Sequence, residues 1–229
     1  MMIIPSGERV SPLYAQYLAE TLETVWRPCD RCQRRRTLNL GHGRWVECAP
    51  GQSIVLILRH VRCRRCHTVE TVFPPWLLPY ESLTVEMMES MLTAIEIRGE
   101  SLETVAAAHQ VSVERVQALW HRWRAVLPEW PYQVEQEAAV STAAPLVDTQ
   151  TWQPPATARS ASWAWLQVAW QALALLWGLA LPPSGWVFWR TVAPECMPAT
   201  PISAHCHLGQ RLRQPRWRAP PPWPLIPRG

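Results

Sequence analysis

Two Cys-x-x-Cys pairs give the strongest chemical signal in the sequence: Cys29-Asp-Arg-Cys32 and Cys63-Arg-Arg-Cys66. Each pair can form a turn that points both sulfurs at one place, and thirty residues separate the two pairs. Four thiolates brought together suit Zn²⁺, which has no redox chemistry and is bound tetrahedrally in structural sites. The sequence therefore predicts a closed, structural zinc site whose ligands are Cys29, Cys32, Cys63 and Cys66.

A redox pair and a disulfide are the alternatives for such cysteines. A redox Cys-x-x-Cys pair belongs near a βαβ unit, and no such pattern surrounds these residues. Disulfides need an oxidising compartment, whereas the first 26 residues lack a basic start and a long apolar run and so predict a cytoplasmic protein. Cys48 is expected to be a small buried residue rather than a ligand. An exchange of one cysteine ligand for His67 stays open.

Arginines surround both cysteine pairs. All 22 basic residues of the chain are arginine, and residues 27–66 hold ten of them against only Asp30 and Glu47. A local cationic patch attracts polyanions, although a solvated face is the simpler interpretation of a charge run. Arg62, Arg64 and Arg65 are therefore candidate DNA contacts. Neighbouring arginines would also lower the thiol pKa values.

The segments between and after the cysteines predict a small antiparallel sheet. The β-prone runs GRWVEC (43–48) and SIVLILRHVR (53–62) are bounded by the turn signals GHG (41–43) and APGQ (49–52). A hairpin of this kind would bring the two cysteine pairs to one place. The proline-rich stretch PPWLLPY (74–80) predicts an extended connector that leaves the sheet.

Residues 83–127 have a helical pattern with recognisable ends. Gly99 would end the first helix, and Ser101 and Ser112 can cap two further helices. Pro128 would end the last helix. The first helix has one apolar face made of Leu83, Met87, Met91 and Ile95.

The two capped helices fit a helix-turn-helix. Val105 and Ala106 would lie where the helices meet, and Val116 and Leu119 would form the inward face of the second helix. The outward face of that helix, with Gln117 and His121, would enter a major groove. There Gln117 can read adenine and arginines can reach phosphates. The candidate DNA contacts on this helix are Arg115, Gln117, His121, Arg122 and Arg124. The turn has His109-Gln110 where glycine is usual, and a plain helical hairpin stays open as the alternative.

The order of these parts resembles a known arrangement. The stretch RHVRCRRCHTVETVFPPWLLP (59–79), followed by GESLETVAAAHQVS (99–112), is similar to the N-terminal region of bacterial insertion-sequence transposases. It resembles still more closely a family of uncharacterised bacterial proteins with the same zinc ribbon and helix-turn-helix. The resemblance covers about residues 26–127. It implies binding of double-stranded DNA by the ribbon and the helix-turn-helix.

Transposase catalysis is not expected. A ribonuclease-H-like domain needs three carboxylates that hold two metal ions. The acids after residue 130 are Glu135, Glu137, Asp148 and Glu195, and none lies in strand-like sequence. We therefore expect no enzyme and no small-molecule substrate, but a DNA-binding accessory protein or a transposon-derived remnant. The alternative is a protein-interaction adaptor that uses the ribbon and the tryptophan-rich helix described next.

The C-terminal half predicts a linker, an apolar helix and an irregular tail. The helix is tryptophan-rich and uncharged, and its apolar residues repeat every three or four positions on one face. This face favours packing against another helix or a homodimer through residues 163–181. Membrane association is less favoured, because Trp170 would lie near mid-span rather than at an interface.

Together these expectations describe an α+β protein. Its expected parts are a helical lead-in (1–25), a zinc ribbon with connector (26–80), a helix-turn-helix (81–130), a linker (131–160), a tryptophan-rich helix (161–181) and a disordered Pro/Arg-rich tail (182–229).

Overall fold

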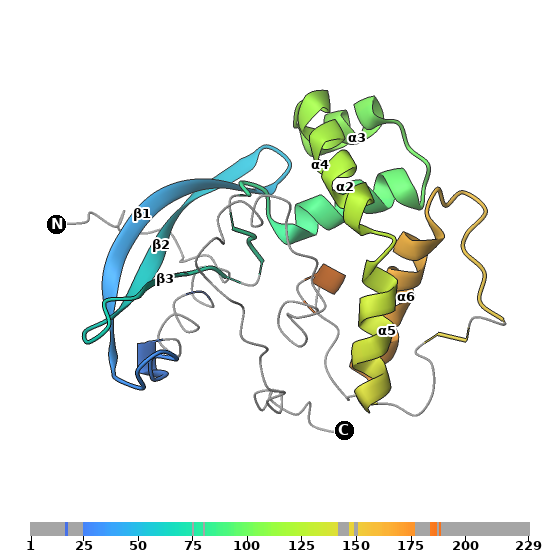
Figure 1. Cartoon of the computed structure of the whole chain (residues 1–229). Helices are drawn as coiled ribbons and strands as arrows, with labels where there is room; N and C mark the ends of the chain where they lie inside the picture. The colour runs from blue at the N-terminus through green and yellow to red at the C-terminus, as the bar shows by residue number, and fades with distance from the viewer. Residues whose placement is uncertain are drawn as a thin grey trace, which may run out of the picture. The chain divides into compact units, whose positions relative to one another are not determined.

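The computed structural model covers the whole chain and describes residues 17, 25–74, 76–79, 81–141, 147–148, 151–176, 184–186 and 188. These residues form an α+β structure (Figure 1). The strands are β1 (Arg36–Ala49), β2 (Gln52–Cys63) and β3 (Val69–Val72). The helices are α2 (Val85–Glu96), α3 (Leu102–His109), α4 (Val113–Val126), α5 (Trp130–Ser141) and α6 (Ala161–Leu176). Most of the expected lead-in, 1–25, lies outside the described residues.

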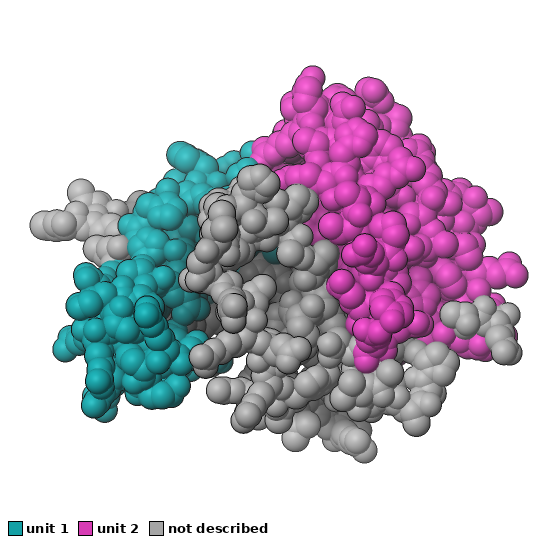
Figure 2. Space-filling view, viewed as in Figure 1, with its two compact units in different colours: residues 1–47, 53–82 teal, residues 48–52, 83–229 magenta. Residues whose placement is uncertain are grey.

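The chain divides into two compact units, coloured separately in Figure 2. The first unit contains residues 1–47 and 53–82, and the second contains residues 48–52 and 83–229. The cysteine pairs belong to the first unit, and all five described helices belong to the second.

The three strands form one sheet in the order β1-β2-β3. A Pro50-Gly51 turn joins β1 to β2, as the sequence predicts, and β3 pairs antiparallel with β2. In this register Arg62 lies opposite Val69 and His60 opposite Thr71. The strands contribute five buried apolar side chains to the core of the unit: Val46, Leu56, Leu58, Val61 and Val72.

The glycines of GHG do not form the expected turn. Strand β1 continues through residues 41–43 without a turn and is 14 residues long. Glycine is needed at 41 because a Cβ there would lie 1.9 Å from the carbonyl oxygen of Leu58 on the neighbouring strand. Glycine inside a strand marks such a close approach between backbones, and this reason cannot be read from the local pattern.

A buried tyrosine fastens β2 to β3. The Tyr17 hydroxyl donates to the carbonyl oxygen of Val72 at 3.2 Å and accepts from the backbone N–H of Arg59 at 2.6 Å. The connector after β3 is also part of this core, because Trp76, Leu77 and Leu78 are buried. The described residues of the proline-rich connector are therefore packed.

Helices α2, α3 and α4 pack against one another in the second unit. Thr84 caps α2, Ser101 caps α3 and Ser112 caps α4, each with its side-chain oxygen accepting a backbone N–H of the first turn. A hydrogen bond from the indole of Trp120 to the buried carboxylate of Glu96, 2.5 Å long, links α4 to α2. The two serine caps agree with the sequence prediction.

Residues 130–141 form helix α5, although the sequence predicted a linker from 131 onward. Trp130 and Val134 are one turn apart and both buried, so packing supports a helix that composition did not indicate. Pro131 lies in the first turn, where its missing N–H breaks no helical hydrogen bond. Of the remaining linker, the described residues 147–148 and 151–160 contain no helix or strand.

Four indole rings form the centre of the second unit. Trp123, Trp130, Trp163 and Trp186 come from α4, α5, α6 and the chain after α6. The Trp123 and Trp186 ring centroids are 4.1 Å apart, and the other neighbouring pairs lie at 5.8 to 6.2 Å. Such offset and tilted ring pairs stabilise a core beyond the area they bury.

The start of the predicted tail is part of this core. Ser184, Gly185, Trp186 and Phe188 are all buried, so these described residues of the predicted tail are packed. Trp186 packs among rings from three other segments, and the sequence around residue 186 does not predict these contacts. The rest of the predicted tail lies outside the described residues.

The apolar face of α6 is buried within the chain. Trp163, Leu166, Trp170 and Leu173 are at most 7% exposed, and α6 packs beside α5, as Figure 1 shows. This agrees with the expected packing against another helix, while residues 177–181 of the expected helix lie outside the described residues. None of the described helices is long and apolar enough to cross a membrane.

A buried carboxylate joins α2 to α6 and to the segment after it. Glu89 accepts hydrogen bonds from the side chain of Gln167 at 2.9 Å and the backbone N–H of Gly185 at 3.1 Å. It also accepts from the hydroxyl of Ser184 and the backbone N–H of Trp186. Four donors compensate the cost of burying this side chain.

Candidate metal centre and nucleic-acid interface

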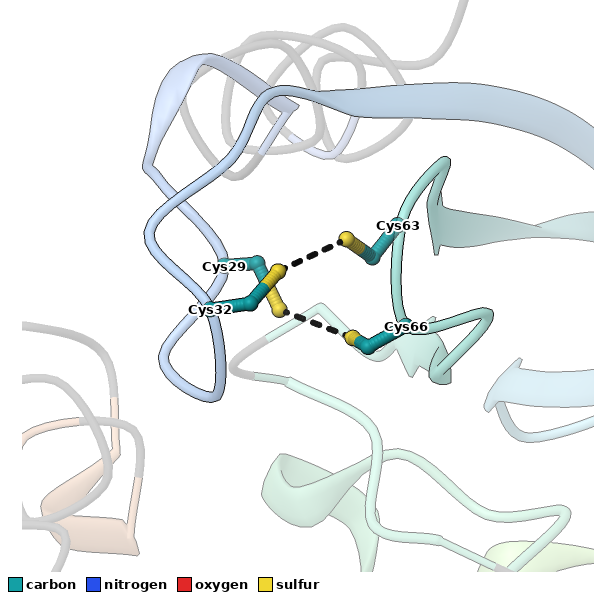
Figure 3. A group of neighbouring side chains, drawn as sticks. All are labelled: Cys29, Cys32, Cys63 and Cys66. Atoms are coloured by element: carbon teal, nitrogen blue, oxygen red, sulfur yellow. Dashed lines mark hydrogen bonds between the residues drawn. The ribbon is translucent and has the colours of Figure 1, made fainter.

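The four cysteines of the two pairs lie together, as Figure 3 shows. Their sulfur atoms are all within 4.8 Å of one another, with Cys29–Cys66 at 3.5 Å and Cys32–Cys63 at 3.4 Å. Zinc bound tetrahedrally at about 2.3 Å holds its sulfur ligands roughly 3.8 Å apart, so the four donors fit a metal ion. The predicted clustering is confirmed.

The first pair is held by a tight backbone turn before β1. The N–H of Cys29 donates to the carbonyl of Arg34 at 2.9 Å, and the N–H of Gln33 donates to the carbonyl of Cys29 at 2.7 Å. Gln33 has a φ of 57°, in the left-handed region. This fold of the chain turns the side chains of Cys29 and Cys32 to the same side (Figure 3).

The second pair repeats this turn between β2 and β3. The N–H of Cys63 donates to the carbonyl of Thr68 at 2.9 Å, and the N–H of His67 donates to the carbonyl of Cys63 at 3.1 Å. His67 has a φ of 56°, matching the equivalent position of the first turn. We call these turns the first knuckle (29–34) and the second knuckle (63–68). The site is thus built from two equivalent halves.

Thr68 contributes a hydroxyl to the sulfur cluster. Its Oγ1 lies 3.1 Å from the sulfur of Cys66 and 3.6 Å from that of Cys29. The Thr68 hydroxyl lowers the pKa of Cys29 to about 6 and, together with the Thr68 N–H, lowers the pKa of Cys66. The N–H of Arg34 lowers the pKa of Cys32, but desolvation and the neighbouring thiols outweigh it and raise that pKa to about 11. Thr68 therefore favours the thiolate form that a metal requires.

Arg36 connects the first knuckle to β3. Its guanidinium donates to Glu70 at 2.7 Å and to Asp30 at 3.2 Å, and its side chain is only 8% exposed. One largely enclosed guanidinium thus engages both acids that lie closest in sequence to the cysteine pairs. The composition did not single out Arg36, since nothing local shows that Asp30 and Glu70 lie near each other.

The predicted DNA contacts of the first unit are on its surface. Arg62, Arg64 and Arg65 are all exposed. Arg62 and Arg64 line one groove together with Thr37, Asn39 and His67, and its volume is about 290 Å³. Arg65 does not line it.

The predicted DNA contacts on α4 divide by exposure. Gln117 and His121 are exposed neighbours, with their Nε2 atoms 3.5 Å apart. Arg124 is exposed too, and its guanidinium lies 5.1 Å from the ring centroid of Trp120. The remaining two candidates are half-buried: Arg115 and Arg122.

The turn between α3 and α4 has a glutamine, rather than the usual glycine, in the left-handed conformation. Gln110 adopts a φ of 55° and its N–H donates to the carbonyls of Ala106 and Ala107, which ends α3. Val105 and Ala106 are buried where α3 packs, and Val116 and Leu119 are buried on the inward side of α4. The inward and outward positions agree with the sequence prediction.

The remaining cysteine in the described part of the chain, Cys48, is not in the cluster. It is half-buried rather than buried, and its thiol donates to the carbonyl of Gln52 at 3.6 Å. It lies at the end of β1, away from either knuckle in sequence. The expectation that it is not a metal ligand agrees with this position.

The geometry defines an α+β protein with an antiparallel sheet and a four-cysteine site able to hold a metal ion. Beyond this class, the chain matches no protein-family model, no curated protein and no solved structure.

Proposed function

We propose that this protein binds double-stranded DNA without catalysing a reaction on it. The observation that carries the proposal is the division of α4 into two faces. Val116, Leu119 and Trp123 are buried, whereas Gln117 and His121 are exposed on the other side. A capped helix with an outward polar face is what enters a major groove in helix-turn-helix proteins.

We propose zinc as the metal of the four-cysteine site. Two equivalent knuckles supply four sulfur ligands, and all-thiolate tetrahedral sites select zinc or iron. A closed site with four protein ligands is structural, because no position is left for water or substrate. The metal would hold the ribbon together in the cytoplasm, where the thiols stay reduced.

The transposase-like arrangement of the parts supports the same proposal. A four-cysteine ribbon followed by paired helices resembles the end-binding region of insertion-sequence transposases. A transposon-derived protein that retained this region would bind DNA through arginines of the first unit and through α4. Phosphates would be held by Arg62, Arg64 and Arg65, and bases would be read by Gln117.

Selection of duplexes from a random pool by the full-length, zinc-loaded protein tests this proposal, with zinc measured in the same preparation. We expect an enriched sequence, about one zinc per chain and affinity that falls steeply with salt. Gln117→Ala should relax preference at one position by about 1–3 kcal/mol, whereas Gln153→Ala, an exposed glutamine outside the helices, should change nothing. Absence of binding to any duplex at low salt would overturn the proposal.

A protein-interaction adaptor is the second candidate, favoured by exposed tryptophans. Trp26 is 83% exposed and Trp45 is 70% exposed, both in the first unit. Tryptophan is enriched at protein interfaces. Changing Arg62, Arg64 and Arg65 to Glu separates the candidates: DNA retention disappears if the protein binds DNA, while partner capture persists if it is an adaptor. A homodimer through residues 163–181 stays a prediction for sedimentation to measure.

A further inference from the structure

We infer that the groove beside the second knuckle binds a phosphate group of the nucleic-acid backbone. Five side chains line it: Thr37 and Asn39 on β1, Arg62 on β2, Arg64 in the second knuckle, and His67 at its end. We call it the phosphate groove. The inference rests on the proposed DNA binding and deepens it. It assigns Thr37, Asn39 and His67 to the phosphate-binding site, and it predicts that binding at this site does not depend on base sequence.

The lining has the chemistry of an anion site. Amide, guanidinium and imidazole groups of the lining can donate hydrogen bonds to an anion, and no carboxylate lines the groove. Guanidinium groups match phosphate oxygens in a bidentate manner. No apolar or large aromatic side chain is present to stack on a base, so the groove suits the phosphate of a nucleic acid rather than a whole nucleotide.

The neighbouring acids do not compete for the groove arginines. The carboxylate of Glu70 and the carboxylate of Asp30 each form an ion pair with Arg36. Across the described part of the chain, no carboxylate lies within ion-pair distance of Arg62 or Arg64. Both arginines are exposed, so their charge is available to a polyanion.

The groove is also organised before any ligand arrives. The Thr37 hydroxyl donates to the backbone carbonyl of Arg62 at 3.2 Å, which fixes β1 against β2 at this point. The guanidinium of Arg62 lies 3.3 Å from Nδ1 of His67, which directs it toward the second knuckle. The backbone of Arg64 lies within the turn that the hydrogen bonds of that knuckle close. Side chains that are already placed lose less entropy on binding.

Salt titration of binding to a fixed duplex tests the groove. In the double variant Arg62→Ala/Arg64→Ala, we expect binding to weaken at least about tenfold at moderate salt, equally for all sequences. The slope of log K against log[salt] should become shallower by about 0.9 for each phosphate that the variant no longer neutralises. Arg98→Ala is the matched control, because Arg98 is exposed but paired with Glu100, and it should keep the wild-type slope.

Asn39→Ala tests the groove without changing charge. It should weaken binding a few-fold while leaving the salt slope unchanged, since a neutral donor releases no counterion. Zinc content confirms that each variant is folded, and Arg62→Gln replaces the double variant if that one loses zinc.

Three outcomes would overturn the inference, and they differ from failure of the function itself. If the wild-type protein binds duplex DNA and the groove variants keep its affinity and salt slope, the phosphate groove is refuted while the proposed DNA binding stands. Wild-type protein that binds phosphatidylglycerol vesicles but no duplex assigns the arginines to a lipid headgroup instead. Wild-type protein that binds neither removes both the groove and the proposed function.

Discussion

At the scale of single residues, the four-cysteine site includes the hydroxyl of a threonine that is not one of the four candidate ligands. Thr68 reaches the sulfurs of Cys66 and Cys29 with one hydroxyl, and it lowers the pKa values of both thiols. Groups that hydrogen-bond to metal ligands tune their basicity and fix their orientation. The spacing of the cysteines predicts the ligands, but only the packing of the second knuckle against the first shows that one hydroxyl serves both halves.

Replacement of Thr68 by valine should therefore weaken zinc binding. Thr68→Val removes the hydroxyl at nearly constant volume, which raises the pKa values of Cys29 and Cys66 and makes their thiolates harder to form. We expect about a 10- to 100-fold loss of zinc affinity in competition with a chromogenic chelator. Thr68→Ser keeps the hydroxyl and should stay within a few-fold of wild type. Equal affinities for the valine and serine variants would contradict this role.

At the scale of secondary-structure elements, three turns place a non-glycine residue in the left-handed region. Gln33 and His67 occupy the next-to-last positions of the two knuckles, and Gln110 ends α3. Glycine adopts this conformation with less strain than any residue that carries a Cβ. The chain therefore holds strained positions at the turns that place its candidate binding residues.

Glycine at position 110 should stabilise the second unit. Gln110→Gly removes a steric cost of about 1 kcal/mol at the end of α3, which corresponds to roughly 3 °C in the melting temperature. Ala108→Gly is the matched control, because Ala108 is exposed inside the same helix and glycine there costs about 0.5–1 kcal/mol. Thermal unfolding followed by circular dichroism measures both. Destabilisation by both substitutions would show that Gln110 is not strained.

Elements of the second unit also meet at Trp186, a residue from a stretch with no periodic pattern. Trp186→Ala should destabilise this unit by about 3–5 kcal/mol, because a large cavity would open among Trp123, Trp130 and Trp163. Trp26→Ala serves as the control, since Trp26 is largely exposed and should change stability little. Urea unfolding followed by circular dichroism gives both values. A loss below about 1 kcal/mol for Trp186→Ala would exclude it from the core.

At the scale of the whole molecule, the chain consists of two compact units with different cores. The first unit combines a three-stranded sheet with the four-cysteine site, and the second has a tryptophan-centred helical core. Small metal-binding folds depend on the ion for their stability, whereas a packed apolar core does not. We therefore expect the two units to respond differently to loss of the metal.

Removal of the proposed zinc ion should unfold the first unit selectively. In Cys63→Ser, or after chelation, amides of β2 and β3 should exchange hydrogen much faster, while those of α2 and α4 keep their protection. Cys48→Ser is the control, because Cys48 lies outside the cluster, and it should retain both zinc and protection. Hydrogen exchange followed by mass spectrometry resolves the units. Unchanged exchange in β2 without zinc would show that the metal does not stabilise the sheet.

The sequence by itself determined the features that depend on neighbours along the chain. Cysteine spacing predicts the two knuckles, Ser101 and Ser112 predict helix starts, and Pro50-Gly51 predicts the hairpin turn, because each acts within a few residues. The inward face of α4 follows from periodicity in the same way.

Only the tertiary structure decided the features that depend on distant partners. Helix α5 exists because Trp130 and Val134 are buried, and Trp186 is ordered because three other tryptophans surround it. Gly41 continues a strand because the backbone of Leu58 approaches it closely. Burial and close approach are set by residues that the chain brings together from far apart, so composition and periodicity could not show them.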